Sequence, residues 1–108
     1  MAVHPELANG RWHVLTLAEQ LGNIGSEISR AKSWNERGNR YQVWRALERA
    51  LELFDLTLAD ARWKGRLREL CRAREVVCDF IAGNNEYHST AENLQNYFDG
   101  FARQARKL

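Results

Sequence analysis

The apolar residues of this chain recur at alternating intervals of three and four positions, the spacing of helices that pack side by side. Four segments show this spacing, from Val14 to Ala31, from Trp44 to Leu58, from Leu67 to Ile81 and from Leu94 to Leu108. The chain has one proline and few signals of β-strands. The pattern predicts an all-α protein.

Breaks in this spacing predict helices over residues 11–36, 40–59, 61–82 and 90–107. Gly38 is expected to end the first helix and Asn39 to cap the second, while Asp60 is expected to cap the third. Ser89, with Glu92 three residues later, predicts a capping box for the fourth.

Short connections between long helices favour antiparallel neighbours. We therefore expect residues 1–108 to form a single domain with the fold of an antiparallel up-down-up-down four-helix bundle.

Glycines interrupt the first predicted helix at Gly22 and Gly25, and each costs about 1 kcal/mol of helix propensity. We expect the close approach of another helix to offset that cost, with the approach of a ligand as the alternative.

The second and third predicted helices carry more apolar positions than one buried face requires. On the second helix the additional positions are Val43, Ala46, Ala50, Leu53 and Thr57. Two interpretations remain open: burial by two neighbouring helices, or a homodimer surface formed by these two helices.

Arg74 occupies a position in the apolar spacing of the third helix where a leucine would be expected. A buried arginine requires carboxylate partners. The candidates are Glu27, Glu48, Asp55, Glu75 and Asp79. Three interpretations follow: a structural ion-pair network, an arginine that extends from the edge of the core into water, or a pocket that binds an anionic ligand.

The polar segment 84–90 combines amides, a carboxylate, a ring and an imidazole. Loops on rigid scaffolds often carry function, so Asn85, Glu86 and Tyr87 join the candidate binding cluster around Arg74. The alternative is an ordinary turn in which Tyr87 covers the end of the bundle.

Lys64, Arg68 and Arg72 recur every four residues and predict one exposed basic stripe. Cations near a helix start oppose the helix dipole, which a phosphate or nucleic-acid contact would explain. The alternative is a solvated face with salt bridges, and the net charge of +2 does not by itself indicate nucleic acid.

No motif indicates a metal site, a cofactor or a catalytic nucleophile, since the three histidines are scattered. Cys71 and Cys78 are too far apart on one helix for a disulfide, so we expect both to be reduced. Reduced thiols are typical of a cytoplasmic protein, and we expect both side chains to lie in the core. No apolar segment reaches the ~18 residues of a membrane span, and the N-terminus does not have the pattern of a signal peptide.

Four stretches, "GNIGSEISRA", "ALERALELFDLTLAD", "RLRELCRAREVVCDF" and "NNEYHST", resemble an uncharacterised group of small all-helical prokaryotic proteins. In size and helix count the chain also resembles the bundles of the HEPN superfamily, which includes nucleotidyltransferase-associated binding subunits and RNases. The RNase branch has an arginine followed four to six residues later by a histidine, and this chain has no such pair.

Three functions are consistent with these patterns. The first is a non-enzymatic interaction module, a homodimer with Arg74 in an ion-pair network. The second is a module that binds nucleotides or nucleic acid through the basic stripe. The third is an enzyme whose carboxylate–arginine pocket contains Glu27, Asp55, Arg74 and Tyr87.

Overall fold

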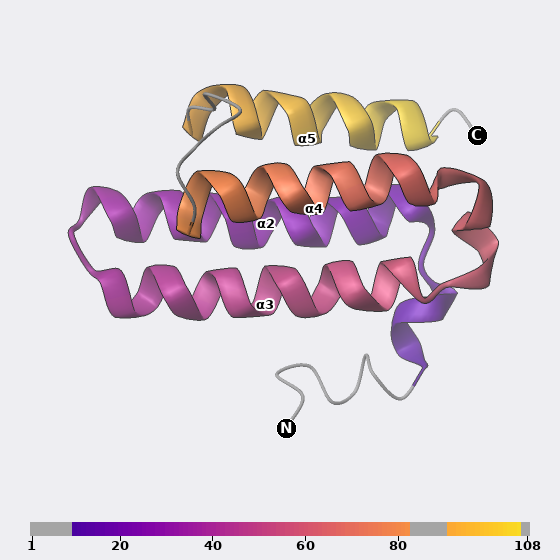
Figure 1. Ribbon diagram of the computed structural model, residues 1–108, viewed down its shortest axis with the longest axis horizontal. Helices are drawn as coiled ribbons and strands as arrows, with labels where there is room; N and C mark the ends of the chain where they lie inside the picture. The colour runs from indigo at the N-terminus through magenta and orange to yellow at the C-terminus, as the bar shows by residue number, and fades with distance from the viewer. Residues whose placement is uncertain (1–9, 83–90, 107–108) are drawn as a thin grey trace.

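The computed structural model describes residues 10–82 and 91–106, and every regular element in these ranges is helical. The elements are η1 (Arg11–Val14), α2 (Leu17–Glu36), α3 (Arg40–Leu58), η2 (Ala61–Arg66), α4 (Leu67–Ala82) and α5 (Ala91–Arg106), where η denotes a 3-10 helix. The predicted all-α class is confirmed. Figure 1 shows the α-helices lying side by side along the length of the molecule.

The first long helix begins at Leu17, so the predicted start at residue 11 is wrong. Thr16 accepts a hydrogen bond from the Glu19 N–H, and the Glu19 carboxylate accepts one from the Thr16 N–H. This capping box separates η1 from α2. In the sequence its signal is Thr16 with Glu19 three residues later, at the start of the apolar spacing of α2. Before it, Val14 is 79% exposed, whereas Trp12 is completely buried.

The connection between α2 and α3 is the predicted one. Gly38 has a φ of 72°, a backbone conformation that glycine adopts without steric cost. Asn39 then caps α3, because its side chain accepts a hydrogen bond from the Gln42 N–H.

The start of the third helix differs from the prediction in one respect. Asp60 acts as the expected cap by accepting a hydrogen bond from the Arg62 N–H. Residues 61–66 are nevertheless a 3-10 helix with non-helical angles at Trp63, and α4 begins only at Leu67. The predicted cap at Ser89 lies outside the described residues.

The core is built from side chains of all four α-helices and from Trp12 of η1. Phe54 of α3 and Phe98 of α5 meet edge to face, with ring centroids 5.9 Å apart. On α4 the fully buried side chains are Leu70, Ala73 and Val77.

The additional apolar stripe of α3 is buried within the chain. Ala46, Ala50, Leu53 and Thr57 are each 2% exposed or less, and Val43 is half-buried. Burial by neighbouring helices is therefore the correct interpretation of this stripe, and these residues do not form a dimer surface.

Helix α2 packs most extensively against α3 and α5, and α3 also packs against α4. The α2–α3 turn lies at one end of the molecule and η2 at the other (Figure 1).

The two interior glycines of α2 have different surroundings. A Cβ at Gly25 would meet atoms of Gln95 and Phe98 at 3.9 Å, so α5 approaches this position as predicted. A Cβ at Gly22 would have nothing within 4 Å, and the prediction of close helix approach is wrong there.

Candidate functional site

Arg74 lies at the edge of the α3–α4 contact. Its Nε donates to Oδ1 of Asp55 on α3 at 3.2 Å, and the two side chains are 37% and 63% exposed. The buried ion-pair network expected around Arg74 is therefore wrong, whereas its position at the edge of the core agrees with the second interpretation and Asp55 is one of the predicted partners. The physical reason is the rotation of α4, which directs Leu70, Ala73 and Val77 into the core and leaves Arg74 beside it.

Glu27 is the buried carboxylate of the predicted set, but its partners are different from those expected. It is 4% exposed on α2, and its Oε2 accepts from Nε of Arg49 on α3 at 2.8 Å. Its Oε1 is paired with Arg30 one turn along α2. A buried Arg–carboxylate pair therefore exists between α2 and α3, not around Arg74.

The remaining predicted site residues lie partly on α3 and α4 and partly outside the described ranges. Glu48 and Glu75 are exposed, and Asp79 is half-buried. Asn85, Glu86 and Tyr87 lie outside the described residues. Among the described residues, Glu27 pairs with Arg49 and Arg30, and Arg74 pairs with Asp55, so the predicted pocket residues belong to two separate pairings.

The basic stripe is exposed at all three positions, Lys64, Arg68 and Arg72. Within the described part of the chain, Lys64 and Arg68 form no ion pair. Arg66, which lies between them in sequence, is paired with Glu69 at 2.7 Å. The stripe therefore presents at least two cations to solvent.

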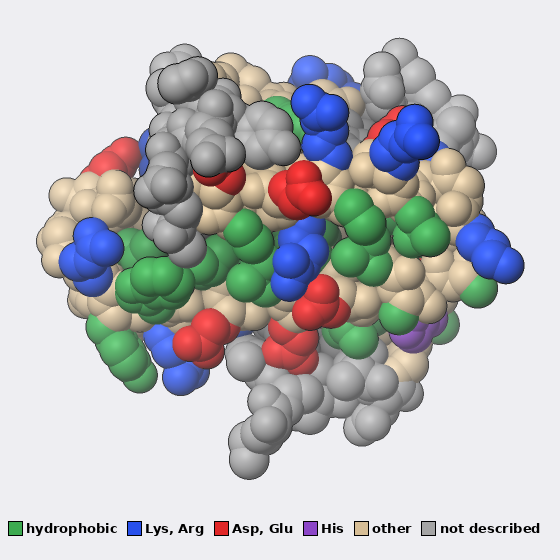
Figure 2. All heavy atoms as spheres, in the orientation of Figure 1, with side chains coloured by type: hydrophobic (Ala, Val, Ile, Leu, Met, Phe, Trp, Pro, Cys, Tyr) green, Lys and Arg blue, Asp and Glu red, His purple; other side chains and the backbone are tan. Residues whose placement is uncertain are grey.

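The α3–α4 face is the surface that carries Arg74. On α3 it contains Trp44, Glu48, Leu51, Asp55 and Leu58, and on α4 it contains Leu67, Cys71, Arg74 and Cys78. Both sets follow the three–four spacing of a packing face. Figure 2 shows hydrophobic side chains on both sides of a basic side chain, which has acidic side chains next to it.

Several apolar residues of the α3–α4 face remain accessible to solvent. Trp44 is 43% and Leu67 is 37% exposed, and Leu51 and Leu58 are partly buried against the core. Cys71 is exposed and Cys78 half-buried, and both are free thiols. The expectation that Cys71 is a core residue is therefore wrong.

Asp60 is a second buried carboxylate, which sequence reasoning treated only as a helix cap. It is 5% exposed, and the Arg62 guanidinium donates to its Oδ1 from Nε at 3.0 Å and to its Oδ2 from a terminal nitrogen at 2.7 Å. Gln20 donates to Oδ2 at 3.2 Å, and His13 Nδ1 lies 3.2 Å from the same oxygen. The carboxylate thus joins η1, α2 and η2.

The polar groups around Asp60 are themselves paired. The Gln20 carboxamide accepts from Trp63 Nε1 at 2.8 Å and donates to the Trp12 carbonyl at 2.9 Å. The Trp12 indole N–H donates to the Thr57 hydroxyl at 2.9 Å. The signal in the sequence was Gln20, a polar residue on the buried face of α2.

The Arg62 side chain holds the pKa of the Asp60 carboxyl well below its ordinary value. Burial opposes this effect, while the Arg62 N–H, Gln20 and His13 reinforce it. A carboxylate already paired in this way favours its charged form and is poorly suited to act as a general base near neutral pH. We interpret the Asp60 cluster as structural.

In residues 10–82 and 91–106, no group of three or more His, Cys, Asp or Glu side chains is placed to hold a metal ion. Among the described helices, none has the length and apolar character needed to cross a lipid bilayer.

Comparison with protein-family models, with curated proteins and with solved structures finds no match to this chain.

Proposed function

We propose that the protein is a non-enzymatic interaction module that forms a homodimer through the α3–α4 face. The observation that carries this proposal is that Trp44 and Leu67, at the two ends of the α3–α4 face, are both accessible to solvent. The residues of this face have the spacing of a packing face on both helices. A two-fold dimer would place this face against its own copy, as isologous interfaces do.

The charges at the centre of the face are complementary to those of a second copy. The Nε of Arg74 donates a hydrogen bond to Asp55, and the terminal nitrogens of Arg74 donate to no other described residue. Asp55 is 63% exposed and keeps a carboxylate oxygen available. Each Arg74 can therefore reach the Asp55 of a partner, and paired interfacial charges of this kind favour one orientation.

The test is the mass of the protein in solution, measured by light scattering over a dilution series. We expect a dimer at high micromolar concentration. Leu67→Glu should weaken association at least about tenfold, because it replaces an apolar side chain of the contact with a carboxylate that would lose its water on association. Val14→Glu is the matched control, since Val14 is 79% exposed but lies in η1.

A strictly monomeric wild-type protein at high micromolar concentration would refute the homodimer. So would a dimer that Leu67→Glu leaves unchanged, since that result would place the contact on another face.

A second candidate is an anion- or nucleic-acid-binding module. The observation in its favour is that Lys64 and Arg68 are exposed and form no ion pair within the described ranges. Fluorescence anisotropy with a labelled oligonucleotide at low salt would detect such binding. Lys64→Glu combined with Arg68→Glu should abolish it, and unchanged binding would exclude the basic stripe.

We also propose the up-down-up-down arrangement for the four α-helices, supported by turns that lie at opposite ends of the molecule (Figure 1). A cytoplasmic location is proposed from the two free thiols. We further propose that the chain is related to the uncharacterised prokaryotic group whose four sequence stretches it resembles, and more distantly to HEPN bundles, which it resembles in size and helix count.

A further inference from the structure

A cavity lies near the end of the bundle where α2 turns into α3. Its volume is about 170 Å³, and every α-helix contributes to its walls. The lining residues are Ile28, Ala31, Lys32, Asn35, Glu36, Arg40, Val43, Trp44, Phe80 and Leu94. A cavity of about 150 Å³ with apolar walls is known to accommodate a benzene molecule, so one ring-sized group fits this volume.

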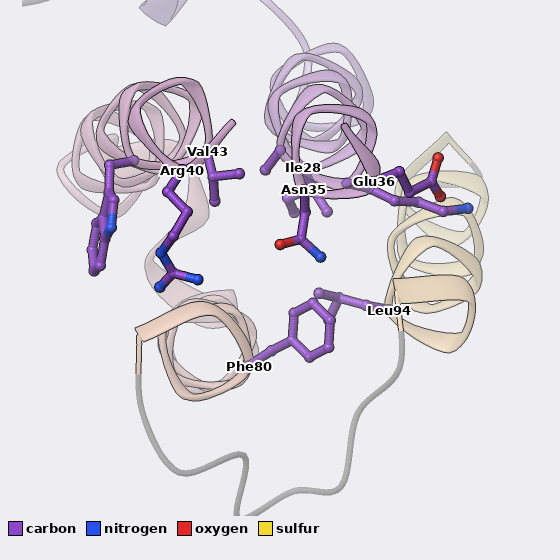
Figure 3. A pocket seen from close by; sticks show the side chains of 10 residues that line it. Ile28, Asn35, Glu36, Arg40, Val43, Phe80 and Leu94 are labelled. Carbon is purple, nitrogen blue, oxygen red and sulfur yellow. The ribbon is translucent and has the colours of Figure 1, made fainter. Parts of the chain in front are cut away.

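The inner walls of the cavity are apolar. Ile28, Ala31 and Leu94 are each less than 5% exposed. Phe80 and Val43 are half-buried, and Figure 3 shows them on opposite sides of the space, Phe80 from α4 and Val43 from α3. An apolar group placed here would lose contact with water on several sides.

Two polar side chains extend into the same space. Figure 3 shows the Arg40 guanidinium reaching down from the first residue of α3 and the Asn35 carboxamide reaching from the last turn of α2 toward Phe80. Neither side chain has a hydrogen-bond or ion-pair partner among the described residues. Glu36, the acidic member of the lining, extends away toward α5 (Figure 3).

We propose that this cavity binds a small carboxylate whose apolar part is about the size of one benzene ring. The apolar group occupies the space between Phe80, Val43 and Leu94. The carboxylate accepts hydrogen bonds from the Arg40 guanidinium, a geometry that matches the planar fork of arginine, and from the Asn35 amide.

This ligand class follows from the combination of walls and polar groups. Inorganic phosphate would leave the apolar walls empty, and a neutral ring would make no ionic contact with Arg40. The charged residues of the lining are Arg40, Lys32 and Glu36, so its net charge is positive and disfavours a cationic ligand.

The experiment is a titration of the full chain with phenylacetate, followed by two-dimensional NMR. We expect saturable shift changes at residues of the cavity, with half-saturation at about 1 mM, the order for a ligand of ten heavy atoms. Phenylacetamide, which has nearly the same shape without the charge, should bind at least about tenfold more weakly.

Two variants connect the binding to the cavity. Arg40→Gln should weaken phenylacetate at least about tenfold, and Val43→Phe should abolish binding by filling the space. Arg37→Gln is the matched control, because Arg37 packs over Trp34 near the same turn and does not line the cavity. Circular dichroism and the thermal midpoint identify any variant that fails to fold.

The proposal is overturned if phenylacetate produces no saturable shifts at 10 mM, roughly ten times the expected half-saturation. It is also overturned if phenylacetamide binds equally well, or if Arg40→Gln affects binding no more than Arg37→Gln does.

Discussion

Asp60 shows how one residue can connect parts of the chain that are distant in sequence. Its two oxygens are paired with Arg62 of η2, Gln20 of α2 and His13 of η1. Arg62 also donates to the Leu15 carbonyl at 2.7 Å. The Asp60 carboxylate therefore attaches the segment before α2 to the α3–η2 corner, together with the hydrogen bond from the Trp12 indole to Thr57.

Asp60→Asn should lower the free energy of unfolding by about 2–4 kcal/mol, because it leaves the Arg62 guanidinium beside a neutral group. Urea denaturation at pH 7 measures this change. Asp55→Asn is the matched control: its pair with Arg74 is exposed, and we expect a loss of less than about 1 kcal/mol in the monomer. Equal losses at the two positions would contradict the structural role of Asp60.

The same carboxylate predicts a dependence of stability on acid. The pKa of Asp60 is lowered in the folded protein from an ordinary value of 3.8, so its stabilisation is complete above that pH and declines as the pH falls further. Glu19, held by the Thr16 cap, contributes in the same direction. Urea denaturation from pH 6 to about pH 2 should show stability falling most steeply in the acid range, and less steeply in Asp60→Asn.

At the scale of the elements, local signals predicted most of the helix positions. Gly38 and Asn39 define the α2–α3 turn because their conformations and caps depend on neighbouring residues only. The position of Arg74 could not be predicted in the same way. The apolar spacing of α4 is compatible with a range of rotations about its axis, and packing selected the one that buries Ala73.

The candidate site was predictable only in part for a related reason. Glu27 was correctly singled out as an acidic residue close to the core, but its partner Arg49 depends on how α2 and α3 face each other. The Asp60 cluster requires that η1 is not a continuation of α2. The Thr16 capping box produces this separation of the two elements. Which side chains pair between two helices depends on how each helix is rotated about its axis. A single sequence contains little direct information about these rotations.

The glycines of the α2 region permit a test at this scale. Gly22→Ala should raise the free energy of unfolding by about 0.5–1 kcal/mol, because the added methyl group enters open space within a helix. Gly38→Ala should lower it by about 1 kcal/mol, because alanine is strained at a φ of 72°. Chemical denaturation of both variants measures the contrast. A loss of stability in Gly22→Ala would show that this position requires glycine.

At the scale of the whole molecule, the helices differ in how extensively their neighbours pack against them. α2 packs extensively against both α3 and α5, while α4 packs most closely against α3 and leaves the α3–α4 face with accessible apolar side chains. Removing that face from water in a dimer would add stabilisation that the single chain does not have. Stability should then depend on protein concentration, since association favours the folded state by mass action.

The thermal midpoint of the wild-type chain should therefore rise by roughly 5 °C between about 2 and 200 µM. Leu67→Glu should remove this concentration dependence, because its folded state is monomeric over the same range, whereas Val14→Glu should retain it. Differential scanning calorimetry at several concentrations measures the three proteins under one set of conditions. A wild-type midpoint that does not change over a hundredfold range would mean that the α3–α4 face does not bind a second copy, and its accessible apolar residues would then need a different partner.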